Sequence, residues 1–315
     1  MAFGSIQSKT VAILGYGNQG RAHALCLRDS GVAVVVGARE GGIAWKTAVQ
    51  DGFAPVRFEE AAKAEVVMFL LPDQVIAPAF RDLVPVLEAS PKAIGFAHGF
   101  AFHFGGVPRL ETCEYFLVAP KGAGSVLRAR YLDGTGLATT YAAAEGSRPQ
   151  TLELAESYAR AIASGAKFIR PTTFQMETEG DLFGEQTVLV GGIMELMRNA
   201  FETLVQNGIP AEMAFFDVCQ ELRATVDLFL KEGPVGMAEK ISPTALYGAA
   251  TRGPRVVGKA AREQMQEIFE QVRSGAFAKE LLDEVQSGSA KLKAAKARDV
   301  GSEWQKTYEK VKEFL

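Results

Sequence analysis

Residues 10–20 read TVAILGYGNQG, and this stretch decides the fold of the first half of the chain. The apolar run TVAIL is typical of a buried strand, and glycines at GxGxxG spacing follow it and open a helix. Gly15 permits a tight turn, Gly17 lets the backbone approach a pyrophosphate, and Gly20 allows helix and strand to pack closely. The free N–H groups at the helix N-terminus attract phosphate oxygens. The stretch therefore predicts a dinucleotide-binding turn made of Gly15, Tyr16, Gly17, Asn18, Gln19 and Gly20.

The sequence around this turn alternates short apolar runs with helical patterns. Several runs are continuously apolar, as expected for strands that are covered on both faces. This order predicts an α/β fold with a parallel, doubly wound sheet, a Rossmann-type domain over residues 1–172. Strands are expected at TVAIL, VAVVV, EVVMFLL, AIGFA, YFLVA, GLATTYAA and AKFIR, with helices at about 19–30 and 44–51.

The pattern changes near Pro171. From Phe174 onward the sequence has helical periodicity and turn residues but no convincing strand, which predicts an all-helical domain over residues 173–315. Helices are expected at about 181–206, 211–231, 257–273 and 276–287, and in the last fifteen residues.

The bulk properties exclude several classes of partner. The net charge of -3 and the lack of a basic stripe argue against nucleic acid. No apolar run approaches the roughly 18 residues that indicate a membrane span, so no membrane partner is expected. The N-terminus MAFGSIQSKT lacks the apolar core of a signal peptide. Together with three widely spaced cysteines, Cys26, Cys113 and Cys219, this predicts a cytoplasmic protein with free thiols.

The end of the second expected strand, VAVVVGARE, is where such domains contact the adenosine ribose. Arg39 can pair with the 2′-phosphate of NADP or stack on adenine, whereas Glu40 beside it repels a phosphate. From these residues alone the choice between NADH and NADPH stays open. Pro72 and Asp73, which follow the strand EVVMFLL, are further expected cofactor contacts.

Two more polar residues stand directly after expected strands. His98 follows AIGFA and Lys121 follows YFLVAP. Ligands of open α/β sheets lie beyond the carboxyl ends of the strands, so both side chains are expected to face a site.

Two pairs of carboxylates lie on apolar helical faces in the second half. Asp181 and Glu185 are four residues apart, and so are Asp217 and Glu221, so each pair points from one side of its helix. The first face continues with Val188, Gly192 and Leu196, and the second continues with Ala224 and Leu228. These faces are expected to be interior surfaces.

Burying such pairs is costly without compensation. Divalent cations provide it, and carboxylate oxygens suit Mg²⁺ or Mn²⁺ rather than zinc. The alternative is that the carboxylates interact with helix dipoles or with arginines such as Arg198 and Arg223. Glu177 and Glu179, just before the first pair, are interpreted only as carboxylates that favour the start of a helix.

Together these motifs resemble the ketol-acid reductoisomerase family, in its short form with one helical domain. The resemblance covers roughly residues 10 to 250, and the acidic segment DLFGEQ followed by a second acidic helix is its most specific part. The motifs are GYGNQG, FAHGF, VAPKG, ETEGDLFGEQ, FFDVCQELRATVDL and ISPTALYG.

The resemblance implies a reaction in two steps at one site. A Mg²⁺-dependent alkyl migration in 2-acetolactate or 2-aceto-2-hydroxybutyrate precedes reduction by NADH or NADPH to the 2,3-dihydroxy acid of valine and isoleucine biosynthesis. It implies that Asp181, Glu185, Asp217 and Glu221 bind two Mg²⁺ ions, with Glu185 bridging them. It also implies catalytic roles for His98, Lys121 and Glu185 and substrate contacts from Glu221 and Ser242.

The family resemblance further implies a homodimer or higher homo-oligomer. In the family the helical domains interlock as a deep knot, and the partner subunit supplies the second carboxylate pair. This chain departs from the family at Asp217, where a glutamate is usual, and at Arg21, where a histidine is usual. Its cofactor loop lacks the usual serine or threonine, which together with Glu40 favours NADH or use of both nucleotides.

Two other functions fit part of the sequence. One is a metal-free dehydrogenase of 3-hydroxy acids or ketopantoate, which would use Lys121 as its acid–base group. The other is a non-catalytic dinucleotide-binding paralogue whose acidic pairs are structural. The dehydrogenase chemistry does not require two carboxylate pairs on interior helix faces, so those pairs discriminate between the readings.

Overall fold

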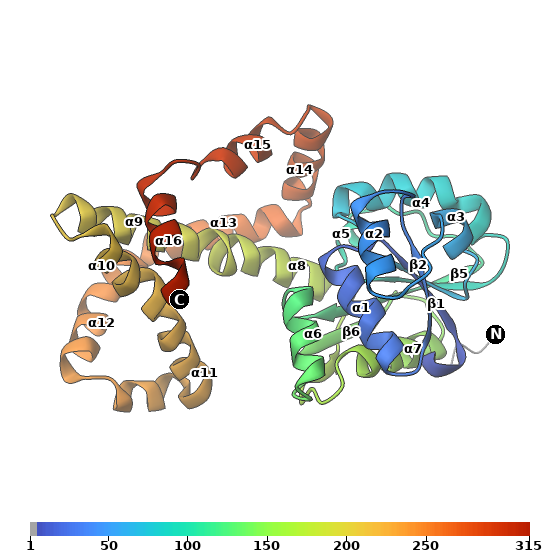
Figure 1. Cartoon of the computed structure of the whole chain (residues 1–315), viewed down its shortest axis with the longest axis horizontal. Helices are drawn as coiled ribbons and strands as arrows, with labels where there is room; N and C mark the ends of the chain where they lie inside the picture. The colour runs from blue at the N-terminus through green and yellow to red at the C-terminus, as the bar shows by residue number, and fades with distance from the viewer. Residues whose placement is uncertain (1–4) are drawn as a thin grey trace. The chain divides into compact units, whose positions relative to one another are not determined.

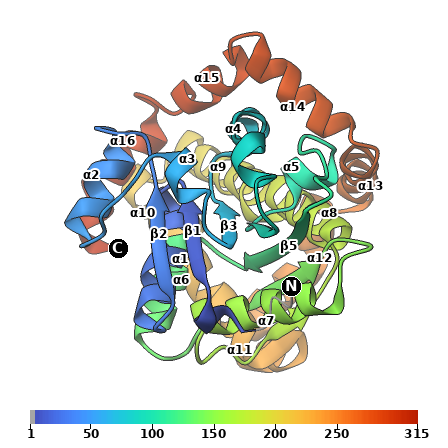
Figure 2. The ribbon, with the colours of Figure 1, turned by 90° about the vertical axis from the view of Figure 1, so that its right-hand side faces the viewer.

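Seven short strands form one sheet in the first part of the chain. The computed structural model describes residues 5–315 and divides into two compact units after Gly180. The order in the sheet is β2-β1-β3-β4-β5-β6-β7, and Figure 2 shows β2, β1 and β3 side by side. The strands are β1 (Thr10–Leu14), β2 (Ala33–Gly37), β3 (Val66–Phe69), β4 (Lys92–Phe96), β5 (Cys113–Pro120), β6 (Thr139–Ala143) and β7 (Ile169–Pro171).

Both faces of this sheet are covered. Val11 and Ile13 of β1 belong to one buried cluster, whereas Ala12 and Leu14 belong to a second. Successive side chains of a strand point to opposite faces, so each cluster is the core on one side. The predicted doubly wound sheet is therefore confirmed, and each predicted strand overlaps an observed one.

One pair of strands departs from the parallel arrangement. β6 runs antiparallel to β5, whereas the other neighbouring pairs are parallel. The backbone N–H of Lys121, just after β5, donates to the carbonyl of Ala138, just before β6, at 2.8 Å. β6 thus begins where β5 ends and must run back along it. The expectation of a wholly parallel sheet is wrong at this pair.

The helices of the first unit connect these strands. The predicted helices at 19–30 and 44–51 are confirmed as α1 and α2, each within one residue. The helices are α1 (Asn18–Asp29), α2 (Ile43–Gln50), α3 (Phe58–Ala61), α4 (Asp73–Leu87), α5 (Phe100–His103), α6 (Gly124–Leu132) and α7 (Pro149–Ile162), after a 3₁₀ turn, η1 (Ile6–Ser8).

Residues 181–315 form helices and turns, and the structure describes no strand there, as predicted (Figure 1). Two of the expected helices are interrupted by π-helical turns, η2 and η3. The elements are α8 (Phe174–Gly184), η2 (Glu185–Leu189), α9 (Gly191–Gln206), α10 (Ala211–Phe215), η3 (Phe216–Gln220), α11 (Glu221–Lys240), α12 (Pro243–Val256), α13 (Lys259–Arg273), α14 (Ala276–Gln286), α15 (Ala290–Ala297), α16 (Glu303–Val311) and η4 (Lys312–Phe314).

Three details of this half differ from the prediction. The helix expected from residue 181 already begins at Phe174, so α8 runs across the division between the units, and the predicted domain boundary at 172/173 lies just before it. Helices α12 and α15 were not predicted. In α12 the glycines and Pro254 lower the helix propensity and hide the pattern.

The apolar faces that follow the carboxylate pairs are open in this chain. Val188 is 52% exposed and Leu196 is 42% exposed, so the expectation of interior surfaces is wrong for the chain by itself. The first of these faces lines a cavity of about 1160 Å³ whose walls are mostly apolar and come from residues 186–268. The buried cluster of this unit is small: Phe201, Ala214, Phe215 and Val311.

No helix among residues 5–315 is both long and apolar enough to cross a membrane.

Candidate functional site

The glycine-rich turn after β1 has the geometry of a phosphate-binding turn. Gly15 has φ +97°, and a Cβ there would lie 2.6 Å from the carbonyl oxygen of Leu70. A Cβ at Gly20 would lie 2.0 Å from the carbonyl oxygen of Gly15, so helix α1 packs directly on the turn. At Gly17 a Cβ would meet no heavy atom within 4 Å, which leaves this backbone open to a ligand. These surroundings agree with the role predicted for each glycine.

Three loops that carry predicted cofactor contacts follow adjacent parallel strands. The glycine-rich turn follows β1, the segment with Arg39 and Glu40 follows β2, and Pro72 and Asp73 follow β3. Arg39 and Glu40 are both exposed. The carboxyl ends of parallel strands meet at one edge of a sheet, so these loops lie at the same edge, where a dinucleotide usually binds.

The loop after β5 also contacts the glycine-rich turn. The side-chain amide of Gln19 donates to the carbonyl of Gly122 at 2.9 Å. A Cβ at Gly124 would lie 2.1 Å from the carbonyl oxygen of Asn18, so the start of α6 packs closely on the start of α1. Lys121, just before Gly122, is thereby held at the same edge of the sheet as the turn, where the parallel strands end.

Glu177 joins the two predicted polar residues at the strand ends. Its side chain is 2% exposed. His98 Nδ1 lies 3.3 Å from Oε2 of Glu177, and the same oxygen accepts from the N–H of Gly99 at 3.1 Å. Lys121 Nζ lies 3.4 Å from the other oxygen, Oε1. The interpretation of Glu177 as a carboxylate that merely favours a helix start is therefore wrong, although it does stand in the first turn of α8.

Burial by itself would raise the pKa of Glu177. The hydrogen bond and charge of His98, the charge of Lys121 and the N–H of Gly99 outweigh burial and hold that pKa below its usual value. Glu177 is therefore a charged group at neutral pH. Its contacts fix the positions of His98, which follows β4, and of Lys121, which follows β5.

Glu179 is also buried, which the sequence did not indicate. It accepts a hydrogen bond from the Gln175 side chain at 2.8 Å. Glu179 lies within α8 and is buried there, so the interpretation that it merely favours the start of a helix is wrong.

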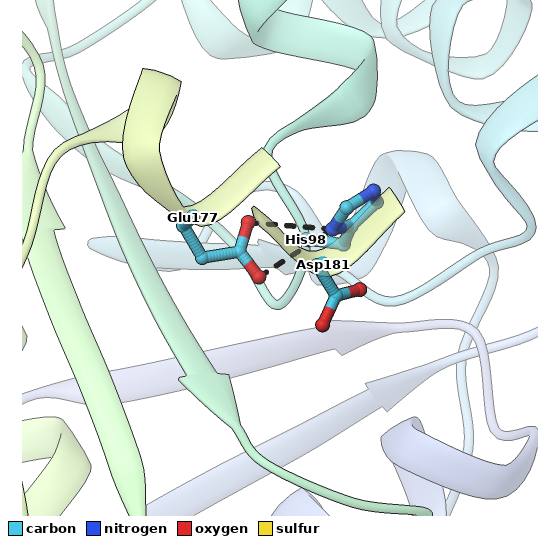
Figure 3. A group of neighbouring side chains, drawn as sticks. All are labelled: His98, Glu177 and Asp181. Carbon is cyan, nitrogen blue, oxygen red and sulfur yellow. Dashed lines mark hydrogen bonds and ion pairs between the residues drawn. The ribbon is translucent and has the colours of Figure 1, made fainter. Parts of the chain in front are cut away.

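A group that can hold a metal ion lies at the same place. One ligand atom each from His98, Glu177 and Asp181 lies within 4.8 Å of the others (Figure 3). Asp181 follows Glu177 by one turn of α8, so the helix itself brings the two carboxylates to one side. Glu185 continues this spacing as the first residue of η2 and is exposed.

The second predicted pair is not part of this group. Asp217 belongs to the π-helical turn η3, and Glu221 opens α11. Both are exposed, and neither is in the group of His98, Glu177 and Asp181. Each carboxylate pair thus adjoins a π-helical turn, a feature common at functional sites.

Comparison with protein families identifies both halves of the chain. Residues 5–167 match the model described as "Acetohydroxy acid isomeroreductase, NADPH-binding domain". Residues 174–315 match "Ketol-acid reductoisomerase, C-terminal domain". The chain belongs to the ketol-acid reductoisomerase family. The metal-free dehydrogenase reading is set aside, because the helical half also matches the reductoisomerase family.

Individual relatives agree with this assignment. A ketol-acid reductoisomerase (NADP(+)) of Methanocaldococcus jannaschii is 40% identical over 93% of this chain and 89% of its own length. One of Pyrococcus abyssi is 41% identical over 91% of this chain and 87% of its own length. A solved NADH-preferring ketol-acid reductoisomerase from an uncultured archean has a TM-score of 0.94 at 36% identity, covering 98% of this chain and 96% of that one.

Three further residues named from the sequence, Ser242, Arg198 and Arg223, have local partners. Ser242 is the N-cap of α12, and its hydroxyl accepts from the N–H of Ala245 at 3.1 Å. Arg198 pairs with Asp299, and Arg223 lies 4.0 Å from Asp227. The recorded ion pairs of these arginines are thus with residues other than the four predicted metal ligands.

Sequence reasoning missed Glu177, although a signal was present. Residues 177, 181 and 185 are all acidic and follow each other at four-residue spacing. Extending the pair Asp181 and Glu185 back by one turn finds Glu177. No sequence pattern, however, connects this helix with the ends of β4 and β5.

Proposed function

We propose that this chain converts 2-acetolactate or 2-aceto-2-hydroxybutyrate to the 2,3-dihydroxy acid by alkyl migration and reduction. The observation that carries the proposal is the row of acidic residues on α8 and η2, Glu177, Asp181 and Glu185, in a chain of this family. The row begins beside His98 and Lys121 at the strand ends of a dinucleotide-binding domain. Metal ligands, proton donors and a cofactor domain are the parts that this reaction needs.

The donor atoms fit magnesium. Asp181, Glu185, Asp217 and Glu221 offer only carboxylate oxygens, the ligands that Mg²⁺ prefers. When bound, Mg²⁺ polarises a carbonyl and stabilises an alkoxide. Asp181 and Glu185 would hold the metal as one ligand pair and Asp217 and Glu221 as the other. Asp217, a proposed member of this ligand set, is one methylene shorter than glutamate.

Proton handling is assigned to the residues around Glu177. The buried carboxylate orients Lys121 Nζ and His98 Nδ1 from one side, and both side chains remain partly exposed, at 36% and 20%. Lys121 is placed to donate a proton to a substrate oxygen. His98 holds a neighbouring position around the same carboxylate. Glu221 and Ser242 are proposed substrate contacts.

A second subunit is part of the proposal. The open apolar faces after Glu185, with Val188 and Leu196 at 52% and 42% exposed, resemble surfaces that another chain covers. The cavity of about 1160 Å³ along residues 186–268 provides room for helices of a partner. We propose a homodimer, or a higher homo-oligomer, in which the partner's second carboxylate pair completes the metal site.

The activity assay tests the function directly. Oxidation of NADH or NADPH is followed with 2-acetolactate, with and without Mg²⁺. We expect turnover that depends on substrate and falls at least about 100-fold in excess chelator, because oxygen ligands alone cannot supply the Lewis acid. Full activity in chelator contradicts the assignment of the carboxylates.

The nucleotide preference forms a second prediction. We propose that the enzyme uses NADH or both nucleotides, since Glu40 repels a 2′-phosphate and the loop lacks a hydroxyl donor. Replacing Glu40 with serine removes the repulsion and adds a donor. The ratio of kcat/KM for NADPH to that for NADH should rise about tenfold, a change of ~1.4 kcal/mol.

Steady-state kinetics with both nucleotides measure this ratio. Glu59→Ser, which removes another exposed glutamate from the same domain, is the control and should leave the ratio unchanged. A wild-type preference for NADPH of 100-fold or more refutes the role assigned to Glu40.

A further inference from the structure

Asp51 joins three separate parts of the cofactor domain. Its carboxylate accepts from Arg21 Nε at 2.6 Å and from Arg21 Nη2 at 2.8 Å, a bidentate pair. The same carboxylate accepts from the Tyr16 hydroxyl at 2.9 Å, and the Asp51 carbonyl accepts from Arg28 at 2.6 Å. Tyr16 lies in the glycine-rich turn, Arg21 and Arg28 lie on α1, and Asp51 caps the end of α2.

Helix α2 needs such an anchor. It is only eight residues long and lies beside β2 at the edge of the sheet (Figure 2). Ala48 is its one buried residue, whereas Ile43 and Val49 are 87% and 53% exposed. The apolar burial of α2 is therefore small, and the hydrogen bonds at Asp51 attach its C-terminal end to α1.

The start of α2 leads directly from the segment that selects the cofactor. Residues 38–42 connect β2 to α2 and contain Arg39 and Glu40. The position of this segment depends on where α2 lies, because the helix begins at Ile43 immediately after it. A contact that fixes the far end of α2 therefore also limits the movement of the segment.

The contacts at Asp51 involve a carboxylate that is largely buried and charged. The Asp51 side chain is 14% exposed, and the hydrogen bonds from Arg21 hold its pKa below the usual value, so the carboxylate is charged at neutral pH. A bidentate arginine–carboxylate pair is among the stronger and most directional hydrogen-bonded arrangements. Phe53 adds packing, because the Arg28 guanidinium lies 4.6 Å from its ring centre and Tyr16 meets its ring edge-on.

We propose that Asp51 is a positioning residue for the adenosine half of the nicotinamide cofactor. It ties the glycine-rich turn and α1 to the end of α2 and so keeps residues 38–42 in place for the adenosine ribose. The inference rests on cofactor binding by this domain and not on the metal site or the reaction. It also gives Arg21 a definite task, which is to hold Asp51 rather than to contact substrate.

The test is nucleotide binding in the absence of Mg²⁺ and substrate. Asp51→Asn keeps the shape of the side chain but removes its charge. The Kd for ADP-ribose, measured by calorimetry, should rise about tenfold, because the loop must then be ordered on binding. In turnover, KM for the nucleotide should rise similarly while kcat changes less than about twofold.

The chain offers a matched control in Glu114. This carboxylate is also 14% exposed and also pairs with an arginine, Arg148, at 2.6 Å. It stands near the start of β5, at the opposite edge of the sheet from the glycine-rich turn. Glu114→Gln should lower Tm about as much as Asp51→Asn does but leave the Kd for ADP-ribose within about twofold.

Two results overturn the proposal. One is a Kd for ADP-ribose that is unchanged in Asp51→Asn, and the other is an equal weakening in Glu114→Gln. If Asp51→Asn does not fold, Arg21→Gln removes the bidentate partner from an exposed position and should raise Kd about threefold. A wild-type chain that binds ADP-ribose but shows no reductoisomerase turnover leaves this inference standing and refutes only the proposed function.

Discussion

Replacing Glu185 with glutamine is expected to lower kcat for the complete reaction by at least about 10³-fold, or ~4 kcal/mol in the activation free energy. Glutamine has nearly the same size, but its neutral amide is a poor ligand for Mg²⁺, and the residue is assigned to two ions at once. Both steps should fail together, because alkyl migration precedes reduction. The fold should be retained, since Glu185 is exposed in the chain.

Three measurements distinguish a lost ligand from a lost fold. Calorimetry should show weaker binding of Mg²⁺ to Glu185→Gln, whereas the Kd for ADP-ribose and the Tm should stay close to wild type. Glu212→Gln is a suitable control, because Glu212 is an acidic residue of the same helical unit that pairs with Lys310 at 3.0 Å. Near-normal turnover of Glu185→Gln contradicts its role as a bridging ligand.

Replacing Glu177 with glutamine is the second change with a large expected effect. The amide can still accept from the N–H of Gly99, but it no longer attracts Lys121 or His98 by charge. Misplacing a proton donor by about 1 Å can cost about 100-fold in rate, and we expect a loss of that size in kcat. Glu179→Gln alters another buried carboxylate of α8 and should keep turnover within about threefold.

The same variant has a defined pH dependence of stability. The pKa of Glu177 is lower in the folded chain than the ordinary glutamate value of about 4.3. Its contribution to the free energy of unfolding is therefore complete above that value and is lost as pH falls through the folded pKa. Urea unfolding should show a stability difference between wild type and Glu177→Gln that shrinks as pH falls below about 4. A difference that grows as pH falls below about 4 contradicts the assignment.

The contacts of Glu177 could not be predicted from the sequence. Its partners Lys121 and His98 are 56 and 79 residues away in the sequence. The sequence placed both of them correctly after strands, and it placed the acidic run on a helix. No local pattern states that the first turn of this helix packs against the ends of β4 and β5, so the carboxylate that joins them was given a minor role.

The antiparallel strand and the open helix faces could not be predicted from the sequence for the same reason, because both depend on how distant segments pack. The alternation of strands and helices does not reveal that α6 and the loop to Ala138 return the chain to the edge where β5 ends. Likewise, apolar side chains at helical spacing indicate that a face will be covered, but not by which chain. Val188 and Leu196 have the pattern of a core and are half exposed in a single chain.

The sequence by itself determined the features that depend on short-range chemistry. The strand–turn–helix at Gly15, Gly17 and Gly20, the strands of the sheet and the four-residue spacing of Asp181 and Glu185 follow from backbone sterics and side-chain periodicity. Only the tertiary structure decided which distant residues meet, because contacts such as Glu177 with Lys121 and Asp51 with Arg21 are set by the packing of whole elements. That packing made Glu177 the centre of the site and Asp51 the anchor of α2.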